Sequence, residues 1–121
     1  MEDTDSNFKL MRVILLSAGA GVDRAINGKQ AIQMIFSEMV YDLIIMDIKL
    51  PGNDDGYDVT RKIREKDKNI PIVANTAYAI IGEKEKAIEA GCNAYIVKPT
   101  IRPLLLNTIT ELIQNSHGDM N

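Results

Sequence analysis

Three polar side chains of different chemistry follow apolar segments of this chain of 121 residues: Asp47, Thr76 and Lys98. A carboxylate can act as a nucleophile and form an acyl phosphate. An ammonium group and a hydroxyl can hold the oxygens of a transferred phosphoryl group. The negative charge on phosphorus needs a divalent cation, and Mg²⁺ prefers a few carboxylates together with retained waters. Glu2 and Asp3, just before the first expected helix, are the obvious acidic supplement, so these residues suit phosphoryl chemistry.

The segment that carries Asp47 predicts a buried strand of a parallel sheet. The residues from Leu43 to Met46 are all apolar and mostly branched, a pattern typical of strands covered on both faces. Pro51 and Gly52 then stop the strand. In open α/β sheets, ligands bind beyond the carboxyl ends of the strands. Asp47 is therefore the first candidate for chemistry.

Helices and strands alternate along the chain, which predicts an α/β fold with a parallel sheet wrapped on both faces. Right-handed crossovers keep the strands parallel, so their carboxyl ends share one edge of the sheet. A single polar residue there is readily explained as a strand end that meets water, but three together favour a functional site. We expect helices at 6–18, 31–40, around 59–63, at 81–90 and around 105–113, and strands at 22–26, 43–47, 70–76 and 94–97.

Composition limits the classes of function. The chain is 45% hydrophobic with a net charge of −3, which allows one core and gives no basic surface for nucleic acid. No apolar run approaches the ~20 residues of a bilayer span, and the acidic N-terminus is unlike a secretory signal, which favours a cytoplasmic protein. We expect one domain at residues 1–117 and a polar tail at 118–121, with His117 in solvent. The single Cys92 is expected to be a small, at least half-buried residue.

Several short motifs resemble one family when they are taken in order. Each is weak alone, but together they match the order and approximate spacing of receiver domains of two-component response regulators, over nearly the whole chain. The sequence around Thr76 and Lys98 is most similar to that of receivers of hybrid histidine kinases. The resemblance implies a flavodoxin-like, doubly wound parallel sheet. The motifs are Glu2-Asp3, residues 46–51 (Met-Asp-Ile-Lys-Leu-Pro), 55–57 (Asp-Gly-Tyr), 75–79 (Asn-Thr-Ala-Tyr-Ala), 89–92 (Glu-Ala-Gly-Cys) and 95–99 (Tyr-Ile-Val-Lys-Pro).

The resemblance implies a phosphoacceptor rather than an enzyme, with at most slow self-dephosphorylation. Asp47 would take a phosphoryl group from a phosphohistidine on a histidine kinase or a histidine phosphotransfer protein. Asp3, Asp47 and the backbone carbonyl of Lys49 would bind Mg²⁺ directly, and Glu2 would act mostly through water.

The remaining implied roles concern the phosphoryl oxygens and the switch. Lys98, the Thr76 hydroxyl and the Ala77 backbone amide would contact the phosphoryl oxygens. Tyr95 would be the switch aromatic, with plain packing against the last helix as the other reading. Lys49 and Tyr78 would influence how fast the acyl phosphate hydrolyses. A downstream protein partner would bind the surface formed by the helix at 81–90, the strand at 94–97 and the last helix.

The chain departs from the family pattern in two places. The loop at 51–56 is one residue longer than usual, and only Met1 precedes Glu2, where the family has an apolar central strand. Without that strand its two neighbours stand about 9 to 10 Å apart. The neighbours could pair directly, a segment of another chain could fill the slot in a homo-oligomer, or the strand is truncated in the chain as given.

Three other functions stay open from the sequence. A receiver-like interaction module would bind partners without phosphorylation, because its metal site is compromised. An aspartyl phosphatase or phosphotransferase would commonly carry a second acid two residues after the nucleophile, where this chain has Lys49. A flavodoxin-like cofactor binder would need a phosphate-cradling loop after the first strand, which is absent.

Overall fold

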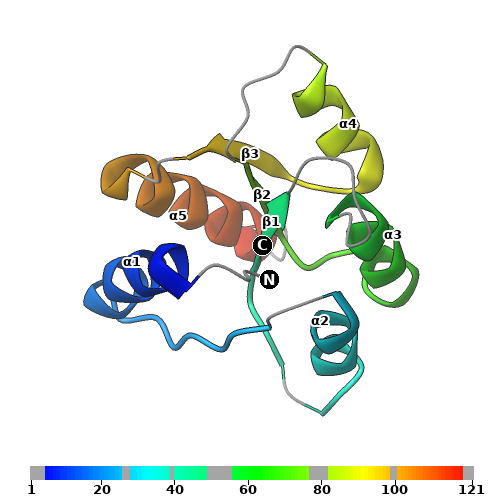
Figure 1. The fold of residues 1–121 in the computed structure, drawn as a ribbon, viewed down its shortest axis with the longest axis horizontal. Helices are drawn as coiled ribbons and strands as arrows, with labels where there is room; N and C mark the ends of the chain where they lie inside the picture. Colours follow the sequence, from blue (N-terminus) through cyan, green and yellow to red (C-terminus); the bar gives the residue numbers. More distant parts are fainter. Residues whose placement is uncertain are drawn as a thin grey trace.

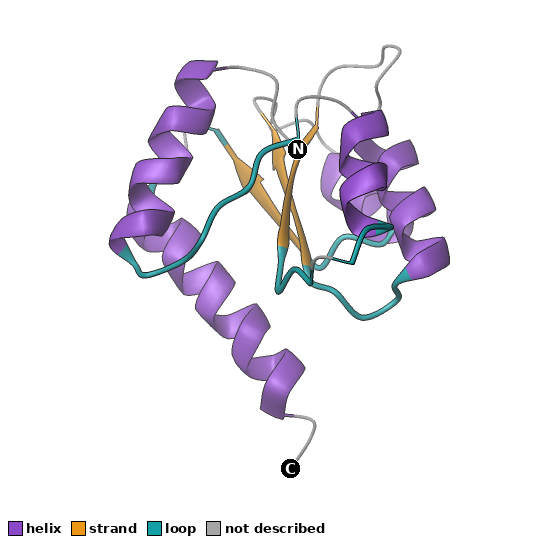
Figure 2. Cartoon of the chain, turned by 90° about the horizontal axis from the view of Figure 1, so that it is seen from below, coloured by secondary structure: helices purple, strands orange, loops and turns teal. Residues whose placement is uncertain are grey.

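The computed structural model describes residues 5–25, 28–38, 40–48, 56–76, 82–98 and 101–118. Three parallel strands in the order β1-β2-β3 form a sheet with helices on both faces (Figures 1 and 2). The helices α1 and α5 lie on one face, and α2, α3 and α4 lie on the other. The elements are α1 (Asp5–Ser17), α2 (Gly28–Ile35), β1 (Ile44–Ile48), α3 (Gly56–Lys66), β2 (Ile72–Thr76), α4 (Glu83–Ala90), β3 (Ala94–Val97) and α5 (Arg102–Gly118). The predicted α/β architecture is confirmed.

The apolar core has two layers, one on each face of the sheet. The central strand β2 contributes to both and is buried along its whole length. Alternate residues of a strand point to opposite faces, so Ile72 and Ala74 join one apolar cluster and Val73 joins the other. The first cluster includes Met46 of β1 and Ile63 of α3. The second includes residues of α1 and α5. The sheet is therefore covered by apolar side chains on both faces.

The predicted strand at 22–26 is wrong for its described part, residues 22–25, which form no strand. Side-chain contacts hold this segment instead. Tyr41 Oη donates to Asp23 Oδ2 at 3.0 Å, and the Arg24 guanidinium lies 4.7 Å from the centroid of the Phe8 ring. No backbone hydrogen bond between described residues joins this segment to β1. An extended apolar segment becomes a strand only where a neighbour completes the ladder of hydrogen bonds.

A cavity of about 640 Å³ lies beside β1, between that strand and residues 19–25. Its lining is largely apolar and comes from both helical layers, with Leu15 of α1, Met34 of α2 and Ile113 of α5 among its residues. Direct pairing of the two neighbouring segments, one of the outcomes expected for a missing central strand, does not occur between the described residues.

Two helix boundaries differ from the sequence prediction. Helix α2 ends at Ile35 rather than near residue 40, and Val40 is 87% exposed. The chain turns there because the backbone N–H and the hydroxyl of Ser37 both donate to the carbonyl of Met34. Helix α5 continues to Gly118, beyond the helix that the sequence predicts around 105–113. No helix in the described ranges is long and apolar enough to cross a membrane.

Candidate functional site

The parallel strands end at one edge of the sheet (Figure 2), and Asp47, Thr76 and Lys98 lie at or directly after the carboxyl ends of β1, β2 and β3. In the parallel register, Asp47 lies beside Asn75, and Thr76 lies between Ile48 and Val97. Lys98 is the first residue after β3. Asp47 and Thr76 are buried and Lys98 is half-buried. The three side chains therefore start from neighbouring positions, although they lie far apart in the sequence.

Lys98 and Asp47 form a direct ion pair across β2. Lys98 Nζ donates to Asp47 Oδ1 at 2.6 Å. The Asp47 side chain is only 4% exposed and that of Lys98 is 20% exposed, so water screens their attraction weakly. The backbone N–H of Lys98 also donates to the carbonyl of Thr76, which fixes the start of the lysine side chain over the central strand. This pair places a cation directly against the carboxylate of Asp47.

The N-terminus of α3 packs tightly against the end of β1. A Cβ added at Gly56, the first residue of α3, would lie 2.7 Å from the backbone oxygen of Asp47 and 2.5 Å from Ile48 Cδ1. Such distances are shorter than van der Waals contact allows, so glycine is the residue that fits. The start of α3 is therefore held directly against the strand segment that carries Asp47.

Several predicted site residues lie outside the described residues: Glu2, Asp3, Lys49, Ala77 and Tyr78. No group of three or more His, Cys, Asp or Glu residues in the described part of the chain could hold a metal ion. Asp47 is the described member of the predicted ligand set. Its carboxylate is the oxygen donor that Mg²⁺ prefers, so the described part of the site fits one ligand of that ion.

Tyr95 lies on β3, next to the site rather than in it. It is half-buried, and its pKa is raised by burial first and by the charge of Glu83 second. The side chain packs against the apolar cluster that contains Tyr57, Ala87 and Ala90. Its role as a switch stays a prediction.

Cys92 is buried, as expected from the sequence. Burial is the main cause that raises the pKa of its thiol. The buried thiol is therefore unsuited to nucleophilic chemistry.

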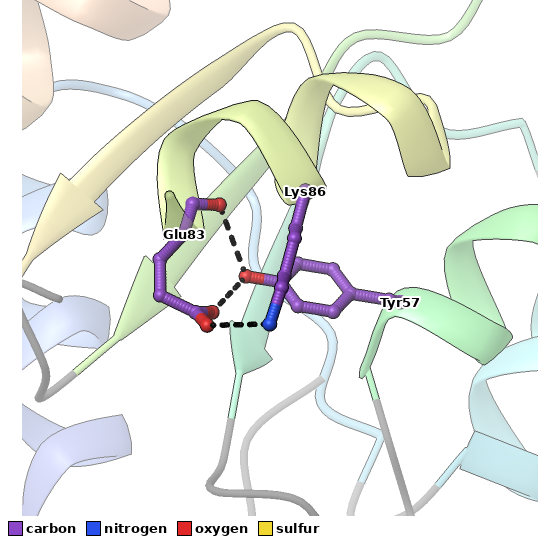
Figure 3. A network of polar contacts seen from close by, with 3 residues as sticks. All are labelled: Tyr57, Glu83 and Lys86. Atoms are coloured by element: carbon purple, nitrogen blue, oxygen red, sulfur yellow. Dashed lines mark hydrogen bonds and ion pairs between the residues drawn. The ribbon is translucent and has the colours of Figure 1, made fainter. Parts of the chain in front are cut away.

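Sequence reasoning missed a polar network between α3 and α4, drawn in Figure 3. Tyr57 Oη donates to Glu83 Oε2 at 2.7 Å, and Lys86 Nζ lies 3.4 Å from Glu83 Oε1. Tyr57 and Glu83 are 26 residues apart on different helices. The Glu83–Lys86 pair could be predicted from its helical spacing, but no local pattern announces the contact with Tyr57.

The family model described as response regulator receiver domain matches residues 1–110 of this chain. The polar-differentiation response regulator DivK of Brucella anthropi is 38% identical over 111 residues, which cover 90% of this chain and 89% of DivK. Hybrid signal transduction histidine kinase I of Dictyostelium discoideum is 40% identical over 113 residues, covering 87% of this chain but 6% of the kinase.

A solved structure of a receiver domain is also similar to this chain. The receiver domain of the sensor histidine kinase PA1611 of Pseudomonas aeruginosa PAO1, with a magnesium ion coordinated in its active-site cleft, is 36% identical. It superposes with a TM-score of 0.82 over 93% of each chain. The family model, the sequence relatives and the solved structure thus agree, and the chain belongs to the response regulator receiver domain family.

Proposed function

We propose that this receiver domain is a phosphoacceptor switch in a two-component phosphorelay, with Asp47 as the residue that takes the phosphoryl group from a phosphohistidine. The observation that carries the proposal is the contact of 2.6 Å between Lys98 Nζ and Asp47 Oδ1 at the carboxyl edge of the sheet. The partner that donates the phosphoryl group is a histidine kinase or a histidine phosphotransfer protein. A cytoplasmic location belongs to the same proposal.

In the proposed reaction, an oxygen of Asp47 attacks phosphorus and the bond between phosphorus and the imidazole nitrogen breaks. The nitrogen keeps the electron pair, and the product is an acyl phosphate. The Lys98 ammonium, already seated beside the carboxylate, then neutralises charge on the phosphoryl oxygens. The Thr76 hydroxyl and the Ala77 amide complete the set of donors in this proposal.

Magnesium would be held by Asp3, Asp47 and the backbone carbonyl of Lys49, with Glu2 acting through water. When bound, the ion supplies positive charge that stabilises the transferring phosphoryl group. The magnesium ion in the cleft of the PA1611 receiver supports this assignment.

The output of the switch is proposed to be a change at the surface of α4, β3 and α5, which binds a downstream protein. Apolar side chains exposed on or next to these helices support this surface: Ile88 on α4, Leu104 on α5 and Ile101 just before α5. Tyr95 on β3 would report the movement of Thr76, and Lys49 and Tyr78 would set the lifetime of the acyl phosphate.

Phosphorylation by acetyl phosphate tests the proposal. In the presence of Mg²⁺, we expect intact-protein mass spectrometry to show a gain of one phosphoryl group in the wild type and none in Asp47→Asn. Asp58→Asn is the matched control, because Asp58 is an exposed acid that pairs with Arg61 on the surface of α3. The control should keep the gain.

A wild type without this mass gain, or an Asp47→Asn variant that retains it, contradicts the phosphoacceptor proposal. The first result would leave the alternative, a receiver-like interaction module that binds partners without phosphorylation.

A further inference from the structure

The network of Tyr57, Glu83 and Lys86 joins the beginnings of two helices (Figure 3). Tyr57 is in the first turn of α3, and Glu83 is the first residue of α4. The Tyr57 hydroxyl donates to the Glu83 carboxylate at 2.7 Å and lies 3.4 Å from the Glu83 backbone carbonyl. The phenol therefore contacts both the side chain and the main chain at the start of α4.

Burial makes the Tyr57–Glu83 hydrogen bond the strong member of this network. Tyr57 is 7% exposed and the Glu83 side chain is 19% exposed, whereas the Lys86 side chain is 65% exposed. Burial is the main cause that raises the pKa of Tyr57, and the bond to Glu83 raises it further. The phenol thus stays a protonated donor to a carboxylate, a type of bond stronger than one between neutral groups. The exposed Lys86 pair contributes little.

The start of α4 has no side-chain cap of its own. The residue before it, Gly82, has a left-handed conformation with φ of 92° and makes no side-chain cap hydrogen bond. Ser, Thr, Asp and Asn cap a helix start because their side chains accept a hydrogen bond from a backbone N–H. Glycine has no side chain that could accept it. Among the described elements, α4 packs against α3 and β3. The hydrogen bond from Tyr57 to Glu83 is a polar contact between described residues that ties this helix start to α3.

Each end of this hydrogen bond lies next to a part of the functional site. Tyr57 follows Gly56, whose backbone is pressed against the backbone oxygen of Asp47. At the other end, Tyr95 packs against the apolar cluster that contains Tyr57 and Ala87 of α4, and the negative charge of Glu83 adds to the raised pKa of Tyr95. The strand segment that carries Asp47 and the surroundings of Tyr95 thus lie at the two ends of the part-buried Tyr57–Glu83 hydrogen bond.

We propose that Tyr57 and Glu83 are positioning residues whose hydrogen bond holds the start of α4 and the surroundings of Tyr95 in the unphosphorylated arrangement. The signalling part of this inference rests on the proposed phosphoacceptor role of Asp47. The positioning of α4 does not. Loss of the bond loosens α4 and favours the arrangement that a phosphoryl group on Asp47 selects.

Hydrogen exchange measured by NMR on the unphosphorylated protein tests the positioning. Tyr57→Phe removes only the hydroxyl, and we expect amides of α4 such as Ala87 and Ala90 to exchange about fivefold to tenfold faster. Amides of α5 should keep their rates, and the ring resonances of Tyr95 should shift. Tyr41→Phe is the matched control, because it removes a hydrogen bond from a different tyrosine to a different carboxylate, that of Asp23.

Variants at Glu83 separate the hydrogen bond from simple packing. Glu83→Gln keeps an oxygen acceptor for Tyr57 and should exchange more slowly in α4 than Glu83→Ala. The positioning proposal is overturned if Tyr57→Phe matches Tyr41→Phe in α4. It is also overturned if α4 and α5 accelerate equally, because that result describes a general loss of stability.

Titration with beryllium trifluoride and Mg²⁺, an analogue of the bound phosphoryl group, tests the signalling part. The Tyr95 resonances should respond at about fivefold lower beryllium trifluoride concentration in Tyr57→Phe than in the wild type. An equal or higher concentration overturns the signalling part. A wild type with no response contradicts the proposed function instead, and the exchange experiment still decides whether Tyr57 positions α4.

Discussion

At the scale of single residues, the site depends on the ion pair between Lys98 and Asp47. Removal of the Lys98 ammonium takes a charged hydrogen-bond donor from the Asp47 carboxylate, which is 4% exposed. We expect Lys98→Ala to lower the free energy of unfolding by about 1 to 3 kcal/mol, measured by urea denaturation at neutral pH.

The surface of α3 offers a matched control for this prediction. Arg61 and Asp58 pair at 2.7 Å but both side chains are more than half exposed. Arg61→Ala should therefore cost about 0 to 1 kcal/mol. Equal losses in the two variants would contradict the view that burial gives the Lys98–Asp47 pair its strength.

At the scale of elements, the contact between α3 and β1 depends on Gly56. A methyl group there would overlap the backbone oxygen of Asp47, which cannot move without displacing the strand. We expect Gly56→Ala to lower the free energy of unfolding by about 1 to 3 kcal/mol in urea denaturation. Gly21→Ala is the control, because a Cβ at Gly21 meets no atom within 4 Å. A Gly56→Ala variant as stable as the control would show that α3 can shift away from β1.

The elements also show what the sequence could and could not predict. The buried strand at Asp47 and the shared edge with Lys98 followed from apolar runs and from the handedness of crossovers. The strand at 22–26 failed because a local pattern cannot show whether a neighbouring strand is available. The Tyr57–Glu83 contact could not be predicted either, because it depends on how two helices pack and not on the spacing within one.

At the scale of the whole molecule, the cavity beside β1 is the main irregularity. Open apolar cavities of this kind are commonly covered by a partner. The homo-oligomer considered from the sequence stays a prediction, and sedimentation equilibrium should detect species heavier than one chain. Val40 lines the cavity and is 87% exposed, so Val40→Lys should weaken association without harming the core. Val13→Lys, at an exposed position outside the lining, should not. A monomer at every concentration would contradict the prediction.

The ion pair joins residues that are 51 positions apart, on opposite sides of the central strand. A ribosome that has released only the first half of the polypeptide has therefore exposed the acid but not the amine. The two can meet only after β2 and β3 have both left the exit tunnel and joined the sheet. Products that end before residue 98 consequently lack this charge pair, so it forms only where all three strands are present.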